Sequence, residues 1–377
     1  MVWRGPYWLP ISLAVMLFIG SIINNFEQEG SGVDVVLTIM CCGALIVMSR
    51  RRIKRNIVSL PADPQFFFRI VSVITVLVAL SHYAVAGLPL LSEDPNVARI
   101  EFMQSTWNFK VLKIFVPFMI VYAMAQLISN PRSKIENFGV LILLSLIQLA
   151  SGGKGAAIWC AVFFALGYSA TNGKLKLKFI VFGALLFCAP TVLFFKFIEG
   201  IDSWGGVGYF LLQRLTGIAE YGLFVVTNGV GDDIRWWTPL MFLSDLFLKL
   251  TGQANFPYTL SFGRRVTGEF YGGDPYSYVW ELTVTALADL YVLFGAFGFI
   301  PALIAYLSAF GVIAKKIISA NSLYAKCGWL TLWYHLSLFI LTGSIVTELV
   351  VRTVPFVAFW LAGAAIYGVL FKSRRVF

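Results

Sequence analysis

The stretch YVLFGAFGFIPALIAYLSAFGVIA, residues 291–314, carries no charged side chain. A helix needs about 20 apolar residues to cross the hydrocarbon core of a bilayer, so this stretch is long enough to span one. The whole chain has the same character, because 59% of its 377 residues are hydrophobic, 16% are aromatic and 13% are charged. This composition is too apolar for a soluble domain and is typical of a polytopic α-helical membrane protein.

Comparable apolar runs lie on both sides of residues 291–314. They cover residues 8–24, 33–49, 66–89, 111–129, 138–151, 155–170, 179–198, 327–347 and 353–371. We therefore expect one all-α membrane domain, residues 1–377, with about ten spans. The first run lacks a small-residue cleavage pattern, and another run follows it closely, so we expect it to stay as an anchor.

The charges between these runs predict the orientation. Basic residues concentrate in 50–55, 130–137, 171–178, 315–316 and 372–375, and the chain has a net charge of +10. The positive-inside rule then places all five segments and both termini in the cytoplasm. Anionic lipid headgroups are sufficient partners for this basic rim, so no nucleic acid is expected to bind.

The opposite face carries one long loop, residues 199–280. Connections of this length are uncommon and are often functional. Segments 205–226 and 236–252 have apolar residues at helical spacing, which predicts amphipathic helices at the outer interface. If both crossed the membrane the count would rise to about twelve spans, but Arg214 and Glu220 would each cost about 2.5–3.5 kcal/mol near a span centre.

Cations on this outer face favour an anionic ligand whose tail lies in lipid. Arg264 and Arg265 stand in the polar loop SFGRRVTGEFYGGDPYSYVWE, residues 261–281, against the positive-inside trend. Lys154 stands in SGGKG, where two short apolar runs must be joined by a turn or an unwound segment. Guanidinium groups bind phosphate oxygens bidentately, and glycine lets backbone N–H groups approach a ligand. The further candidates for binding this anion are Arg99, Arg214 and Arg352.

Two of these cations, Arg352 and Lys154, also have an interpretation without a ligand. Arg352 is four residues from Glu348 and could form an intrahelical pair with it. Lys154 could be a hairpin lysine that reaches the headgroups, an interpretation that also applies to Lys113 and Lys196.

Acids and aromatic residues of the outer face complete the candidate site. The carboxylates that could act as a general base are Glu281, Asp289, Glu220 and Glu348. Tyr271 and Tyr276 could stack on sugar rings or form an interfacial aromatic belt. His82 and His335 lie inside predicted spans, where we expect packed residues bonded to a neighbouring helix. With neither a metal-binding pattern nor a nucleotide motif in the sequence, we expect no cofactor.

The order of three segments resembles the bacterial O-antigen polymerase (Wzy) family. They are GLPLLSEDPNVARIEF at 87–102, LASGGKGAAIW at 149–159, and the long loop leading into TALADLYVLFGAFGFIPALIAYLSAFGVIAKK at 285–316. The resemblance implies a GT-C-like helical fold in the bacterial cytoplasmic (inner) membrane. It also implies transfer of a growing glycan from undecaprenyl pyrophosphate to a lipid-linked repeat unit at the periplasmic face, without a metal. The family often has an arginine at the position of Lys154.

The same resemblance implies three partners: the undecaprenyl-pyrophosphate-linked oligosaccharide, membrane lipids and a chain-length regulator protein. The alternative function is a transporter or flippase of lipid-linked oligosaccharides. Transporters of this kind are often built from internal repeats, and no repeat is visible in the sequence.

Overall fold

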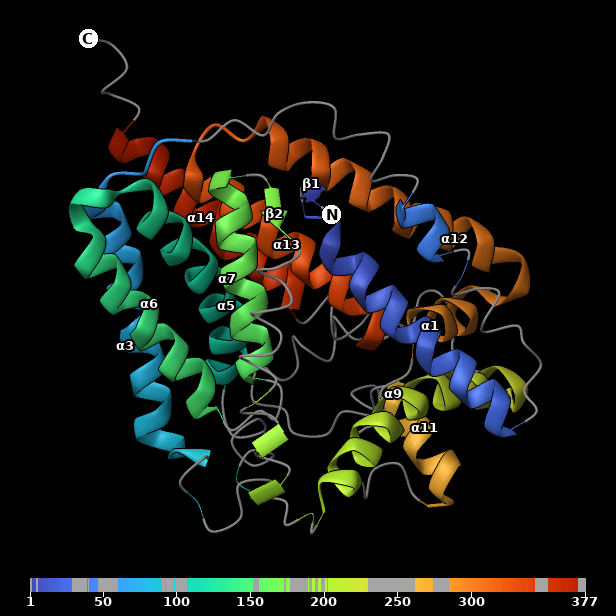
Figure 1. Cartoon of the computed structure of the whole chain (residues 1–377). Helices are drawn as coiled ribbons and strands as arrows, with labels where there is room; N and C mark the ends of the chain where they lie inside the picture. The colour runs from blue at the N-terminus through green and yellow to red at the C-terminus, as the bar shows by residue number, and fades with distance from the viewer. Residues whose placement is uncertain are drawn as a thin grey trace, which may run out of the picture.

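The chain folds into a bundle of helices with one small pair of strands (Figure 1). The computed structural model describes residues 2–4, 6–28, 39, 41–46, 60–89, 92, 98, 107–151, 156–172, 174–176, 189, 192–193, 196–197, 201, 203–229, 262–273, 285–342 and 352–371. Its elements are β1 (Val2–Arg4), α1 (Trp8–Gln28), α3 (Gln65–Ala86), α5 (Trp107–Ser129), η2 (Pro131–Ser133), α6 (Lys134–Ala150), α7 (Ala156–Asn172), β2 (Lys174–Lys176), α9 (Trp204–Thr227), α11 (Phe262–Tyr271), α12 (Ala286–Ser319), α13 (Leu323–Thr342) and α14 (Val354–Phe371).

In the part of the chain that the structure describes, four helical segments are long and apolar enough to cross a membrane. They are Gln65–Ala86, Pro131–Ala150, Phe297–Ser319 and Val354–Phe371. Shorter apolar helices cover Trp8–Ile23, Ile114–Ser129, Ala156–Thr171 and Ala286–Gly295. These helices support a membrane protein of the all-helical class, apart from the two short strands. The predicted spans 33–49 and 179–198 fall mostly outside the described residues, so the expected count of about ten stays a prediction.

α5 is the centre of the bundle. It packs against α3, α6, α7, α13 and α14, and its residues from Ile114 to Ala125 are almost all buried. A helix that is apolar on every side is expected in such a position, because each of its faces meets another helix.

A glycine sets the distance between α5 and α7. A Cβ at Gly167 would lie 2.5 Å from the carbonyl oxygen of Val121 and 2.7 Å from Cβ of Met124. The first of these atoms belongs to the backbone, so the clash could be relieved only by moving a helix. Small residues at membrane helix interfaces allow this kind of close approach.

We expect Gly167→Ala to destabilise the protein by about 1–3 kcal/mol, as overpacking of a tight interface does. Gly139→Ala on α6 is the matched control, because a Cβ there meets no atom within 4 Å. Thermal unfolding in detergent should show a lower midpoint for Gly167→Ala and an unchanged or slightly higher one for Gly139→Ala. Equal midpoints for the two variants would contradict the close contact between α5 and α7.

The predicted span 291–314 is placed differently in the structure. Helix α12 begins earlier, at Ala286, and Gly295 breaks its regular geometry with φ 65° and ψ 178°. Glycine adopts this positive φ without the steric cost that a Cβ would bring. The long apolar segment therefore starts at Phe297, after the kink, and Ala286–Gly295 is a separate short helix. The apolar run predicted at 291–314 therefore contains the kink, and the segment long enough to cross a membrane is Phe297–Ser319.

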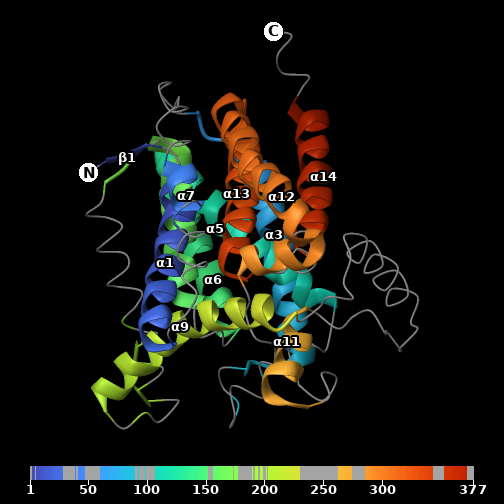
Figure 2. The ribbon, with the colours of Figure 1, turned by 90° about the vertical axis from the view of Figure 1, so that its right-hand side faces the viewer.

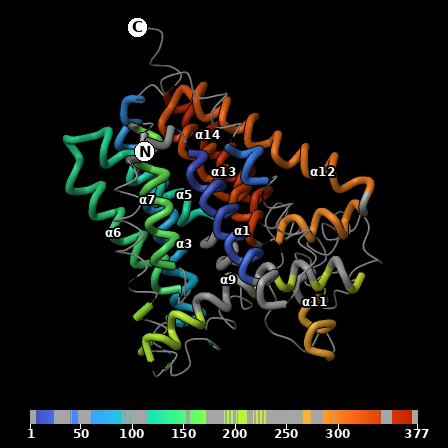
Figure 3. The backbone as a smooth tube through the Cα atoms, turned by 45° about the vertical axis from the view of Figure 1, so that its right-hand side comes forward, coloured from blue at the N-terminus to red at the C-terminus, as the bar shows by residue number. Residues whose placement is uncertain are grey.

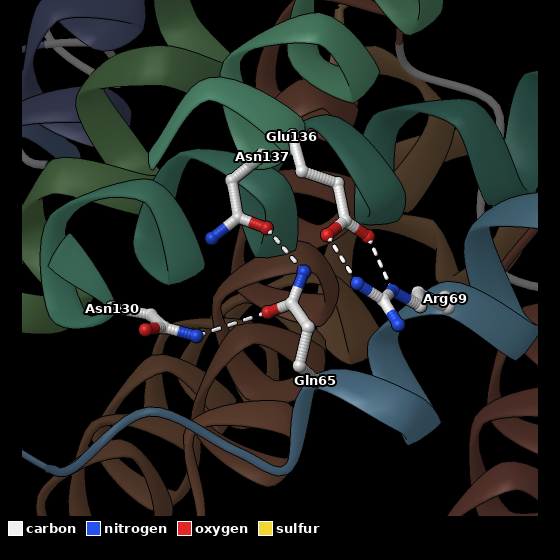
Figure 4. Close-up of polar contacts among 5 residues, drawn as sticks. All are labelled: Gln65, Arg69, Asn130, Glu136 and Asn137. Carbon is white, nitrogen blue, oxygen red and sulfur yellow. Dashed lines mark hydrogen bonds and ion pairs between the residues drawn. The ribbon is translucent and has the colours of Figure 1, made fainter. Parts of the chain in front are cut away.

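Segments that are distant in sequence meet at one end of the bundle, which we call the strand end. Here β1 pairs antiparallel with β2, with Trp3 opposite Leu175. The start of α3 is tied to α6 and to the end of α5 at the same end (Figure 4): the Gln65 amide donates to Asn137 and accepts from Asn130, at 2.8 and 3.0 Å.

An ion pair joins the same helices beside these amides. The Arg69 guanidinium donates two hydrogen bonds of 2.7 Å to the Glu136 carboxylate (Figure 4). The strand end thus contains β1, β2 and the basic segment 130–137. The predicted topology also puts these three segments on one side of the membrane, the cytoplasmic side.

A buried carboxylate, Asp63, accepts hydrogen bonds from three helices at the strand end, α5, α13 and α14. Its Oδ2 accepts hydrogen bonds from the backbone N–H of Tyr324 at 2.6 Å and from the Tyr122 hydroxyl at 3.0 Å. Its Oδ1 accepts from the Tyr367 hydroxyl at 3.1 Å, and its backbone carbonyl accepts from the Gln126 amide at 3.2 Å. Burial raises the pKa of the Asp63 carboxyl above its ordinary value, although hydrogen bonds from Tyr324, Tyr122, Tyr367 and Leu323 act in the opposite direction.

Candidate functional site

The end of the molecule opposite the strands holds α9 and α11, and we call it the loop end. Figure 2 shows α9 lying across the ends of the upright helices, with α11 beyond it. The sequence predicted an amphipathic helix at 205–226, and α9 covers Trp204–Thr227. Ser203 caps its start, because the Ser203 hydroxyl accepts a 2.9 Å hydrogen bond from the Gly206 N–H. The second predicted amphipathic helix, 236–252, lies outside the described residues.

The predicted polar loop 261–281 contains a helix. α11 runs from Phe262 to Tyr271, and the sequence did not predict this helix. The helix ends at Gly272, which has φ 72° and donates a 2.8 Å hydrogen bond to the carbonyl of Gly268. A glycine with positive φ is a common end to a helix, because its N–H then bonds a free carbonyl of the last turn.

Tertiary packing stabilises α11, since a helix of ten residues is marginal alone. Val266 and Phe270 are four residues apart and share one face. Val266 is fully buried in a cluster with Val225 of α9 and Ala288 of α12. The Phe270 ring meets Tyr221 and Phe224 of α9 edge-on, at centroid distances of 5.1 and 5.0 Å. α9, α11 and the start of α12 therefore form one packed unit (Figure 3).

Two predicted carboxylates lie on helices of this unit, Glu220 on α9 and Asp289 on α12. Asp289 lies in the first turn of α12 and is 4% exposed. The turn is capped by Thr285, whose hydroxyl accepts a 3.2 Å hydrogen bond from the N–H of Ala288, and a negative charge is favoured at a helix start. Glu220 lies on α9, four residues before Phe224, so both are on the face that meets α11.

The predicted arginines of the loop belong to the same unit by their backbone positions. Arg264 and Arg265 lie in α11 next to buried Val266, and Arg214 lies in the middle of α9. The side chains of all three lie outside the described part of the structure. Tyr271 ends α11 with a half-exposed ring, 5.1 Å from that of Phe270. Six predicted positions thus lie on the helices of this unit, which are α9, α11 and the start of α12.

The segment that carries Lys154 connects two helices, as predicted. α6 ends at Ala150 and α7 begins at Ala156, so the helices are interrupted at SGGKG. Because α7 leads to β2 at the strand end, its start lies at the opposite end of the bundle. Lys154 itself is outside the described residues.

The start of α7 leads to a second group of predicted residues. Trp159 meets Tyr334 of α13 edge-on at a centroid distance of 5.3 Å. The neighbouring His335 ring lies 5.5 Å from Phe356 at the start of α14, and Arg352 lies in the turn just before that helix. Arg352 is partly buried. Its proposed partner Glu348 lies outside the described residues.

The expectation for the histidines was correct in one respect and wrong in another. His82 and His335 are both buried, at 0% and 1% exposed, as packed residues should be. The hydrogen bond expected for His335 is missing, because neither of its ring nitrogens has a hydrogen-bond partner. Its ring contacts are with Tyr334 and Phe356, and no sequence pattern could have predicted them.

Five predicted site residues lie outside the described residues. They are Arg99, Lys154, Tyr276, Glu281 and Glu348. Within the described part, no group of three His, Cys, Asp or Glu residues could hold a metal ion. Comparisons of the chain with protein-family models, with curated proteins and with solved structures gave no match.

Proposed function

We propose that the chain is a polymerase of lipid-linked oligosaccharides, which makes an O-antigen or an exopolysaccharide. It transfers a growing glycan from undecaprenyl pyrophosphate to a lipid-linked repeat unit at the periplasmic face. The observation that carries the proposal is the packing of α11 on α9 and the start of α12. Through Val266 it packs the helix that carries two adjacent arginines against α9, which carries Glu220, and against the start of α12, which carries Asp289.

The location of this unit supports the proposal. The unit lies at the loop end, away from the basic segments of the strand end, and the positive-inside rule makes the strand end cytoplasmic. Both termini are then cytoplasmic, and the loop end faces the periplasm of the bacterial inner membrane. The proposal includes about ten spans and a GT-C-like arrangement. In it α9 is an interfacial helix and not one of a further pair of spans.

The chemistry needs cations, a base and no metal. An acceptor hydroxyl attacks the anomeric carbon, and the pyrophosphate leaves with its bond electrons. Arg264, Arg265 and Lys154 stabilise the charge that develops on the pyrophosphate, which is the usual electrostatic contribution to such a step. A carboxylate accepts the proton of the attacking hydroxyl, and Asp289 and Glu220 are the two described candidates. A single displacement inverts the anomeric centre.

The remaining predicted residues bind the substrate around this centre. Tyr271 offers a half-exposed ring at the end of α11 on which a sugar can stack. Arg352, Arg214 and Arg99 supply further positive charge near the membrane surface. A chain-length regulator protein is the proposed partner, and the resemblance to the Wzy family is its basis.

Lys154 gives the sharpest test of the leaving-group role. We expect Lys154→Ala to lower turnover by at least about tenfold, because removal of one electrostatic stabiliser commonly costs more than that. Lys154→Arg should keep substantial activity, since charge rather than shape is required. Turnover is measured as the rate at which purified protein consumes lipid-linked repeat units. Wild-type turnover in Lys154→Ala would make this residue a hairpin lysine that reaches the headgroups.

A further inference from the structure

An apolar groove runs between α3, α5 and α14 on the side of the bundle. It encloses about 220 Å³. Buried side chains form its floor, among them Phe67, Val116 and Phe118, which are at most 2% exposed. Its rim is exposed, with Ile74 of α3 at 57% and Ile366 of α14 at 54%. The groove is therefore open to the surroundings of the bundle and deep enough to reach its core.

No polar group in the groove requires water. The Thr75 hydroxyl donates a 2.8 Å hydrogen bond to the carbonyl of Val71 in its own helix. The Tyr324 hydroxyl donates to the carbonyl of Trp360 at 3.3 Å. Cavities with apolar walls and satisfied polar groups stay dry and bind apolar ligands.

The position of the groove selects a hydrocarbon chain as the occupant. Both rim helices, α3 and α14, are apolar enough to cross a membrane, so the opening faces the bilayer core. Along α3 the lining runs from Phe67 to Val78, which at 1.5 Å per residue is about 16 Å. Half of the hydrocarbon core measures about 15 Å, so the groove has the length of a chain from one leaflet.

The end at which the groove begins identifies that leaflet. Phe67 and Tyr324 lie next to Asp63 at the strand end, because the Tyr324 N–H donates to the Asp63 carboxylate. Lys315 and Lys316 lie near the end of α12, shortly before α13 in the sequence, and their side chains are exposed. Lys372 follows α14 in the sequence. A basic rim of this kind attracts anionic headgroups.

We propose that the groove binds one acyl chain of an anionic phospholipid from the leaflet that borders the strand end. The lipid fills the space between α3, α5 and α14, and its headgroup lies at the basic rim. This binding is independent of the proposed polymerase activity, whose residues lie at the loop end.

The test measures lipid retained by the purified protein. The protein is extracted from membranes that contain phosphatidylglycerol and purified in a mild detergent. The lipid bound to it is then counted by native mass spectrometry. Ala362→Trp and Val78→Phe fill the groove from α14 and from α3. Leu361→Trp and Leu77→Phe are the matched controls, because these exposed neighbours, at 55% and 60%, do not line it.

We expect about tenfold less retained phosphatidylglycerol in both filling variants, since ring and lipid cannot share the space, and wild-type retention in both controls. Equal unfolding midpoints in each pair show that the fold is intact. If Ala362→Trp aggregates, Val78→Phe decides the result. The proposal is overturned if all four variants retain as much lipid as wild type. It is also overturned if wild type retains no lipid, or if the molecule displaced is a polyprenyl phosphate.

Discussion

Asp63→Ala should lower the free energy of unfolding of the protein by at least about 3 kcal/mol. The change leaves the Tyr324 N–H and the hydroxyls of Tyr122 and Tyr367 without their acceptor at a site where Asp63 is 5% exposed. Each buried donor left unsatisfied costs about 1–3 kcal/mol. The loss should be large because these three donors belong to the ends of three different helices, α13, α5 and α14.

Glu136→Ala is the control for this prediction. It removes the ion pair between Glu136 and Arg69, which also lies at the strand end. The Arg69 side chain is 59% exposed. Exposed ion pairs contribute about 0–1 kcal/mol, so the unfolding midpoint should hardly move. Midpoints in detergent that fall equally for both variants would show that Asp63 does not hold the helix ends together.

The double variant Arg264→Ala/Arg265→Ala should reduce polymer by at least about a hundredfold while the protein remains folded and inserted. Removing one preorganised donor to a developing charge costs about 10²–10³ in rate, and this variant removes two arginines. Replacement of both by lysine should restore part of the polymer, because a point charge cannot reproduce the bidentate fork of a guanidinium group. Polymer is measured by gel electrophoresis of extracted polysaccharide at equal protein level.

Lys315→Ala/Lys316→Ala is the matched control for the arginines. It also removes two adjacent positive charges from exposed positions, but at the strand end of α12. Polymer of normal amount is expected in this variant. If both double variants made wild-type polymer, the arginines of α11 would have no part in substrate binding.

The sequence predicted those parts of the fold that depend on local pattern. The apolar runs 66–89 and 353–371 correspond to Gln65–Ala86 and Val354–Phe371, with small differences at their ends. The break between α6 and α7 could be predicted because the two apolar runs beside SGGKG are each too short to be one continuous span. These features follow from length and hydropathy, which are local properties of the chain.

Features that depend on contacts between distant residues could not be predicted. α11 is a helix because Phe270 packs on α9, far away in sequence, whereas its own composition is polar. Asp63 looked like one more charge beside a span, and its role depends on Tyr324 and Tyr367. The kink at Gly295 had a signal in the glycines around it, but glycine is also common inside membrane helices.

For the candidate site, the residues could be predicted from the sequence but their grouping could not. Residue type and position outside the spans were enough to select Asp289, Glu220 and the arginines of α11. Their grouping into one unit depends on Val225, Val266 and Ala288, three small or medium apolar residues that no motif marks.

Polymerisation by the purified protein tests the central claim most directly. The chain is reconstituted in vesicles with undecaprenyl-pyrophosphate-linked repeat units, without nucleotide and with a chelator of divalent metals. The proposed function predicts a ladder of glycans, each longer than the last by one repeat unit, and loss of that ladder in Arg264→Ala/Arg265→Ala. Repeat units that cross the vesicle membrane without growing longer would contradict it and identify a transporter instead.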